Sequence, residues 1–224
     1  DAMQSMTPST EAISNSQIGK ITDLLAAGLR KSGLQNQPTQ QVIENQGVQL
    51  VKELINVTRK FVEAVSKCII RQVKVDQTKT PKEIIDATDR TQYVDKEVLA
   101  TMPKGDGEEA EIVFFKLDLS ERNGRILDDD LEKEFELRGL KPADGYSLAK
   151  VNEDDPAFAD SHPNCTHWKD GKGEWCYIAF GQWDDDRRYV DVDRYVDYWR
   201  DCWWFAGLRK EVLRTEVPET PQCL

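Results

Sequence analysis

The sequence predicts an α+β fold, in which a helical N-terminal region precedes a mixed domain. Residues 17–75 contain one aromatic residue, Phe61, and place their apolar residues at helical spacing. After residue 107 the sequence changes to β-branched and aromatic runs, short amphipathic segments and turns, and residues 168–204 hold all six tryptophans. This change in pattern predicts a helical extension attached to a domain that combines helices and strands.

The N-terminal region, residues 1–78, is expected to form two amphipathic helices. The first ends near Gly33 and carries on one face Ile18, Ile21, Leu24, Leu25 and Leu29. The second begins after Pro38 and Thr39 and carries along one stripe Val51, Leu54, Ile55, Val62, Val65 and Ile69. An apolar stripe needs a partner, and the sequence leaves open a hairpin, the rest of the chain, or a homo-oligomer or larger assembly.

The next segments give the boundary and the first elements of the mixed domain. Residues 79–107 mix Thr, Lys, Asp and Pro and end in a Gly-rich turn, which predicts a linker or boundary loop before a domain at 108–224. Residues 111–117 read as a strand. A helix that ends at Gly139 follows, with the acidic residues 128–130 as its N-terminal cap. A short helix over 146–151 comes next, and then short strands separated by turns.

Residues 184–202 have an unusual composition, because every one of them is Asp, Arg, Tyr, Val, Trp or Cys. Val190 and Val192 alternate with Tyr189, Asp191 and Asp193, which is the period of a strand with one buried face. A face rich in Tyr, Arg and Asp is typical of a recognition surface. The alternative is that these charges only solvate a strand edge and discourage aggregation.

Three segments around this stretch carry a resemblance to a known family: THWKD at 166–170, WCY at 175–177 and WWFAGLRK at 203–210. Over roughly residues 111–210 the chain resembles the variable proteins of diversity-generating retroelements, which implies a C-type-lectin-like fold. In that family an error-prone reverse transcriptase changes adenines, so that AAC codons become codons for Tyr, Asp, Cys or Arg. The Gly-Gly-Ser-Trp type of motif of the formylglycine-like branch is missing, and residues 180–183 (FGQW) are the nearest match.

The resemblance implies a ligand-binding display protein that recognises varied proteins or cell-surface ligands, in a virus, phage or cell. The implied variable positions are Arg188, Tyr189, Asp191, Asp193, Tyr195, Asp197, Tyr198, Arg200 and Cys202. The implied scaffold positions are Trp183, Val190, Val192, Trp199, Trp203, Trp204, Phe205 and Gly207.

Two other functions compete with this one. A formylglycine-generating type of enzyme needs two neighbouring cysteines near its C-terminal end, whereas Cys202 and Cys223 are far apart in sequence, so no enzyme is predicted. An invariant structural surface or virion component would keep residues 184–202 identical across isolates. The binding function predicts the opposite.

No metal or other cofactor is predicted. His162, Cys165, His167 and Cys176 are residue types that bind zinc, but their spacing is irregular, and a disulfide between the two cysteines stays open. The adjacent carboxylates of residues 184–186 lack the spacing of a calcium loop.

The net charge and the hydropathy of the sequence restrict the kinds of partner and location that we expect for the protein. A net charge of −11 argues against nucleic acid as a partner. The sequence has no apolar run near the roughly 20 residues of a membrane span and no visible signal peptide, so a soluble protein is expected, either virion-associated or cytoplasmic.

Overall fold

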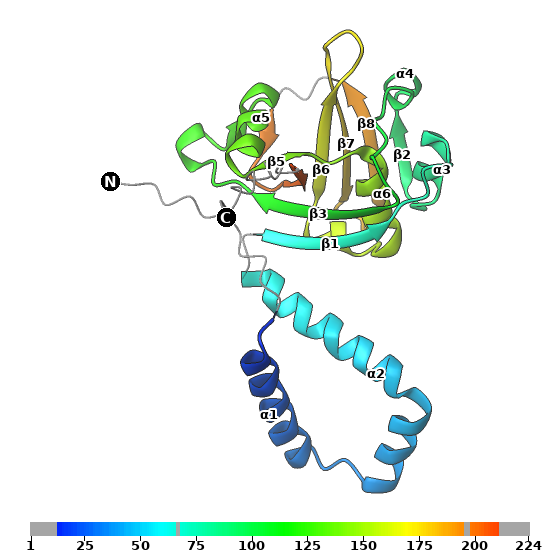
Figure 1. The fold of residues 1–224 in the computed structure, drawn as a ribbon, viewed down its shortest axis with the longest axis vertical. Coiled ribbons are helices and arrows are strands. Elements are labelled where there is room, and N and C mark those ends of the chain that lie inside the picture. The colour runs from blue at the N-terminus through cyan, green and yellow to red at the C-terminus, as the bar shows by residue number, and fades with distance from the viewer. Residues whose placement is uncertain (1–12, 66–67, 195–197, 211–224) are drawn as a thin grey trace, which may run out of the picture. The chain divides into compact units, whose positions relative to one another are not determined.

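A computed structural model of the chain describes residues 13–65, 68–194 and 198–210, and the chain divides into two compact units, Asp1–Lys67 and Cys68–Leu224 (Figure 1). The boundary expected at residue 78 therefore lies about ten residues earlier in the chain. The shift has a local cause, because residues 68–74 already form the first strand of the second unit.

The first unit contains the two predicted helices, α1 (Asn15–Lys31) and α2 (Asn36–Val65). Ser14 and Gln17 form a capping box at the start of α1, and Gly33 follows its end with a φ of 72°. Helix α2 begins before Pro38, which is tolerated in a first helical turn because its missing N–H would have no partner there. Ile69 was wrongly assigned to this helix, since it is buried in strand β1.

The apolar stripes of the first unit are exposed. No residue of α1 is buried, and Leu24 keeps 63% of its surface accessible. Along α2, Ile55 and Val62 are more than half exposed. None of the helices that the structure describes combines the length and the apolar character that a bilayer span requires.

The second unit is built on a mixed sheet with the strand order β1-β3-β10-β6-β7-β8-β2, in which β5 also pairs with β10. The pairs β10–β6 and β2–β8 are parallel and the others are antiparallel. These strands and helices confirm the predicted α+β class. The strands of the sheet are β1 (Cys68–Lys74), β2 (Thr91–Val94), β3 (Glu109–Lys116), β5 (Leu140–Pro142), β6 (Asn164–Lys169), β7 (Trp175–Gln182), β8 (Arg188–Arg194) and β10 (Trp204–Arg209).

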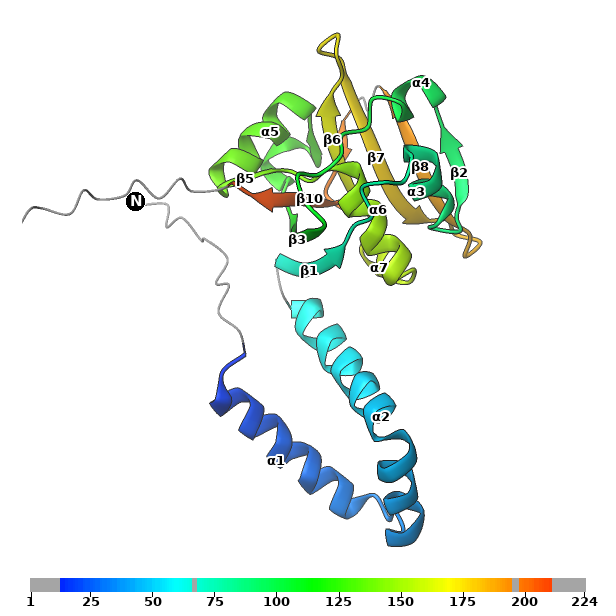
Figure 2. The same ribbon diagram turned by 45° about the vertical axis from the view of Figure 1, so that its right-hand side comes forward.

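Helices cover both faces of this sheet (Figure 2). On one face α6 packs on β1 and β3, α3 packs on α6, and α7 packs on β7. We call this the α6 face; its core includes Ile112, Phe114, Ile178, Val190 and Val192. The opposite or α5 face includes Val113, Phe115, Cys165, Ala179 and Phe205, together with Leu131 and Phe135 of α5. The elements outside the sheet are α3 (Pro81–Asp86), α4 (Lys96–Leu99), the 3-10 helix η1 (Ser120–Arg122), β4 (Arg125–Ile126), α5 (Asp128–Leu137), α6 (Gly145–Asp154), α7 (Phe158–Ser161) and β9 (Trp199–Arg200).

Residues 79–107 are not a linker, which corrects the sequence-based boundary. They form α3, β2 and α4, and β2 is the edge strand of the sheet beside β8. Ile84, Ile85 and Val98 are at most 4% exposed, so this segment belongs to the core. Its elements are only four to six residues long, and tertiary packing rather than local propensity holds them.

The elements predicted within the domain are present, with one correction to a helix cap. The predicted strand is β3, and the two predicted helices are α5 and α6. The acidic residues at the start of α5 make no capping hydrogen bond. The Asp128 carboxylate instead accepts hydrogen bonds from the Trp199 indole (2.9 Å) and the His167 ring (2.7 Å). Asp128 therefore ties α5 to β6 and β9.

Candidate ligand-binding surface

Strand β8 has the predicted alternation. Val190 and Val192 point into the core of the α6 face and are fully buried. Tyr189, Asp191 and Asp193 point to the α5 face, where the first two are partly exposed and Asp193 is exposed. This confirms a strand that buries one face and presents the other, as the period of two predicted.

Aromatic rings gather around Tyr189 on the α5 face. The Trp183 ring stacks on Tyr189 with 4.6 Å between ring centroids. Tyr93 of β2 meets Trp183 edge-on at 6.3 Å. Tyr189 lies over Gly181, where an added Cβ would come within 2.6 Å of the Tyr189 hydroxyl oxygen, so the glycine makes room for the ring. Tyr93 and Trp183 are each 47% exposed.

Asp191 lies next to this aromatic group and is itself partly buried. It is directly opposite Tyr93 on β2 and Ala179 on β7. The Tyr177 hydroxyl donates a hydrogen bond to the Asp191 carboxylate at 3.1 Å. Burial raises the pKa of Asp191, the hydrogen bond from Tyr177 lowers it, and the charge of Asp193 raises it further. No Lys or Arg is among the groups that shift this pKa. We call the set Tyr93, Tyr177, Trp183, Tyr189, Asp191 and Asp193 the open surface.

The arginines of β8 do not belong to the open surface, although Arg188 was predicted to be one of the variable positions. Arg188 lies on the α6 face, where its guanidinium forms two hydrogen bonds to Asp160 at 2.8 and 2.7 Å. Arg194 lies on the same face and bonds to Asp170 (2.6 Å) and to Glu174. Strand alternation explains both positions, because residues 188, 190, 192 and 194 share one parity.

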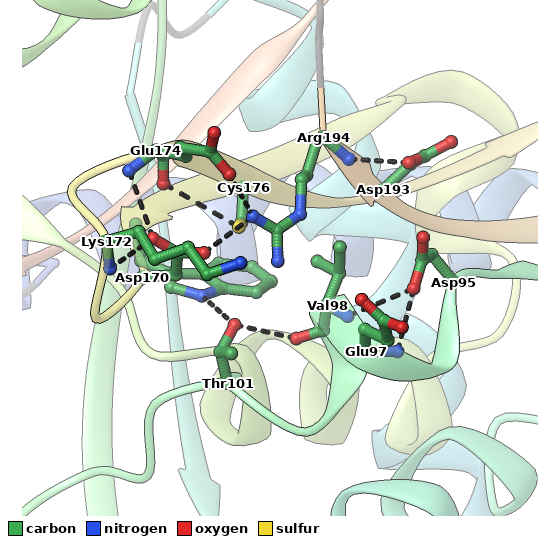
Figure 3. A network of polar contacts seen from close by, with 11 residues as sticks. Asp95, Glu97, Val98, Thr101, Asp170, Lys172, Glu174, Cys176, Asp193 and Arg194 are labelled. Atoms are coloured by element: carbon green, nitrogen blue, oxygen red, sulfur yellow. Dashed lines mark hydrogen bonds and ion pairs between the residues drawn. The ribbon is translucent and has the colours of Figure 1, made fainter.

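The contacts of Arg194 fasten the end of β8 to the hairpin between β6 and β7 (Figure 3). In the same network the Trp168 indole donates to the Thr101 hydroxyl (3.1 Å), which in turn donates to the Val98 carbonyl (2.8 Å). Asp95 caps α4 beside it and accepts from the Val98 amide. The α6 face of β8 is therefore closed by polar bonds as well as by apolar packing.

The predicted positions after residue 197 fall around the short β4–β9 ladder. The Arg125 guanidinium lies 4.0 Å from the centre of the Tyr198 ring, and Arg200 and Cys202 are exposed. Burial raises the pKa of Tyr189 on the open surface, and the charge of Asp191 raises it further. The predicted positions Tyr195 and Asp197 lie outside the described residues.

Most of the predicted scaffold positions are buried, with one exception. Trp199 is 2% exposed, Trp204 7%, and Phe205 0%. Gly207 is also buried, and a Cβ there would lie 3.1 Å from the Leu140 and Phe135 side chains. Trp203 is partly buried against Trp199. Trp183 is the exception, because almost half of its surface is exposed and it belongs to the open surface.

The His and Cys residues considered for zinc are not brought together. Cys165 belongs to the α5 face and Cys176 to the α6 face, and both are free thiols, so the disulfide left open by the sequence is not formed. His162 follows α7 and stacks on Phe158. Across the residues that the structure describes, no three His, Cys, Asp or Glu side chains are arranged to hold a metal ion. Asp185, in the turn after β7, is paired with Arg187.

His167 has a structural environment on the α5 face. Its ring stacks on Trp175 at 4.4 Å and lies between the carboxylates of Asp128 and Glu132, at 2.7 and 3.3 Å. Burial lowers the pKa of His167, but the hydrogen bonds and charges of the two carboxylates outweigh burial and raise it above the usual value. The two carboxylates therefore stabilise the charged form of this ring relative to a ring in water.

A cavity of about 520 Å³ lies between β5 and β6 and has three lysines in its lining. Lys104 donates to backbone carbonyl groups, Lys141 pairs with Asp106, and Lys169 pairs with Asp129. Each of these three lysines therefore already has a partner within the chain.

Two tyrosines of the open surface were missed by sequence reasoning. Tyr93 falls in the segment taken for a linker, although the run TQYV at 91–94 has strand character. Tyr177 joins through its pairing with Asp193, which is known only once the strands are in register.

Searches against protein-family models, curated proteins and solved structures give no match to this chain.

Proposed function

We propose that the protein is a ligand-binding display protein and that the open surface is part of its recognition site. The most direct support is that the two faces of β8 differ in burial, because the strand buries Val190 and Val192 fully and presents Tyr189 and Asp191. Tyr and Trp offer large, rigid contact areas with polar tips, which is why they are common in recognition sites. Substitutions on the presented face leave the apolar core below unchanged.

The finer proposal is that this domain is a C-type-lectin-like variable protein whose surface is diversified by a retroelement. It is supported by the residues in question, since Tyr189, Asp191, Asp193, Tyr198, Arg200 and Cys202 are all residue types that mutation of an AAC codon can produce. Of these, Tyr189, Asp191 and Asp193 lie on the open surface.

The test is to sequence the gene in related isolates. Variation is expected at the codons for residues 189, 191, 193, 198, 200 and 202, with the codons for 190, 192 and 199 unchanged. A near-repeat carrying AAC codons and a reverse transcriptase gene should lie nearby. If all these codons are identical across isolates and neither the repeat nor the polymerase gene is present, the invariant structural component is the better description.

The display function is proposed in place of an enzymatic one. Burial raises the pKa of the Cys165 thiol well above its usual value and also raises that of Cys176, so neither favours the reactive thiolate form. These two thiols also lie on opposite faces of the sheet. An assay for conversion of peptidyl cysteine to formylglycine tests this directly, and turnover by the purified protein would contradict the proposal.

The helices α1 and α2 are proposed to attach the domain to a second copy or to a larger assembly. The exposed stripe that includes Leu54 and Ile55 supports this, because a surface of this kind is usually covered by another chain. Light scattering on the full chain should report an oligomer, and replacing both residues by Gln should lower the measured mass. A full chain that is already monomeric at micromolar concentration would argue against self-association.

A further inference from the structure

We propose that the open surface binds a cationic side chain, Lys or Arg, of a protein partner, with Asp191 as its counter-ion and the rings of Tyr93, Trp183 and Tyr189 around it. This inference rests on the proposed function, because it gives the chemistry of the ligand at the same site. Three observations support it. Strand β8 places its positive and negative side chains on opposite faces, no described cation pairs with Asp191, and no described cation lies over the aromatic rings.

The register of β8 separates positive from negative charge. Both arginines of the strand, Arg188 and Arg194, lie on the α6 face and are paired with carboxylates there. On the α5 face the strand presents only Tyr189, Asp191 and Asp193. Strand β8 therefore gives the open surface two carboxylates and no cation, and a complementary ligand would be positive.

Among the described residues, no Lys or Arg is paired with the partly buried carboxylate of Asp191. Its hydrogen bond comes from a neutral hydroxyl, that of Tyr177. Two other partly buried carboxylates of the unit do pair with cations, Asp160 with Arg188 and Asp170 with Arg194. Removing a carboxylate from water without a cation is unfavourable, and a ligand that supplies the cation recovers that free energy.

The rings of the open surface also lack cations, whereas other rings of the chain have them. Arg71 lies over Phe158, Arg125 over Tyr198, and Lys169 over Trp175, at 4.0 to 4.5 Å from the ring centres. Within residues 68–194 and 198–210, no Lys or Arg lies over the rings of Tyr93, Tyr177, Trp183 or Tyr189. A guanidinium or ammonium group placed there would gain cation–π contacts next to a carboxylate.

The experiment uses the full chain, labelled with ¹⁵N, and a short end-blocked peptide, Gly-Arg-Gly. The control peptide carries citrulline, which has nearly the same shape as arginine but no charge. The arginine peptide should shift the amide signals of residues 91–94 and 188–194, and the shifts should weaken as salt is added. The citrulline peptide should leave these signals in place.

Variants locate the counter-ion. Asp191→Asn keeps an acceptor for the Tyr177 hydroxyl, so the fold should be retained, and it should weaken binding of the arginine peptide about tenfold. Glu121→Gln is the matched control, because it removes the same charge from an exposed residue of η1 and should leave binding unchanged. Equal binding of the two peptides, equal effects of the two variants, or binding of neutral sugars but not of the arginine peptide would each overturn the inference.

This outcome is separable from that of the proposed function. If the codons of the open surface vary among isolates and the arginine peptide does not bind, the display function stands and the cationic ligand is wrong. If the peptide binds and the codons are invariant, the cation site stands and the diversified display is wrong.

Discussion

The two faces of β8 differ in nearly every physical property, although their residues alternate along one seven-residue strand. On the α6 face, Val190 and Val192 are fully buried and the flanking arginines are held by carboxylates. On the α5 face, Tyr189 and Asp191 meet only neutral or like-charged neighbours and remain partly exposed. Neighbouring residues of the strand therefore differ in role: those on the α6 face stabilise the core, and those on the α5 face form the surface that we propose for recognition.

The largest expected effect comes from moving the charge of one face onto the other. Val192→Asp would bury a carboxylate in the core without a partner, and the free energy of unfolding should fall by roughly 3–5 kcal/mol. That is a large share of the total stability of a typical domain, about 5–15 kcal/mol. The midpoint of urea denaturation, followed by circular dichroism, measures the change.

The control for this variant is the reverse exchange on the other face. Asp191→Val removes a partly buried carboxylate and adds a residue with a high strand propensity, so the free energy of unfolding should change by no more than about 1 kcal/mol. Similar losses for the two variants would mean that the open surface is as much a part of the core as the α6 face.

Gly181→Ala should have an intermediate effect, because it strains the floor of the open surface. The new methyl group would lie 2.6 Å from the Tyr189 hydroxyl oxygen and 2.7 Å from the adjoining ring carbon, so the ring must leave its stack with Trp183. Overpacking of this kind costs about 1–3 kcal/mol. Thermal unfolding gives the loss of stability, and titration with the arginine peptide should show weaker binding. Gly171→Ala, with no neighbour within 4 Å of the added atom, should change neither quantity, and an equal loss there would exclude the packing explanation.

The sequence predicted the parts of this contrast that depend on local periodicity. The helical spacing before Gly33, the acidic start of α5 and the alternation around Val190 are all readable from residues close in the chain. The same parity places Arg188 on the α6 face with Val190, although the resemblance implied that Arg188 is one of the variable positions. Tyr93 and Tyr177 join Asp191 only through pairing with two other strands, and this register is a property of the assembled sheet.

The part of the α5 face that α5 covers should show a pH dependence that comes from His167, a residue type that the open surface does not contain. The pKa of His167 is raised in the folded protein by its bonds to Asp128 and Glu132, which outweigh the effect of burial. The contribution of protonated His167 to the free energy of unfolding is therefore fully present below the pKa of the unfolded state, about 6.5. It is lost as the pH rises through the raised pKa of the folded state. Urea midpoints measured from pH 5 to 9 should fall over this range. His167→Gln should flatten the profile, and an unchanged slope in that variant would assign the titration to another group.

The smallest effect separates two adjacent residues. Arg188→Ala removes a pair whose side chains are 36% and 24% exposed, so solvent screening limits the loss of stability to about 0.5–1 kcal/mol. Because Arg188 lies on the α6 face, binding of the arginine peptide should not change. Tyr189→Ala should instead clearly weaken binding of the arginine peptide, because Tyr189, the next residue along the strand, supplies a ring of the open surface. Chemical denaturation and the peptide titration, made on both variants, give the two quantities. Weakened binding in Arg188→Ala to the same degree as in Tyr189→Ala would mean that recognition extends around the strand edge, and that the two faces are not independent.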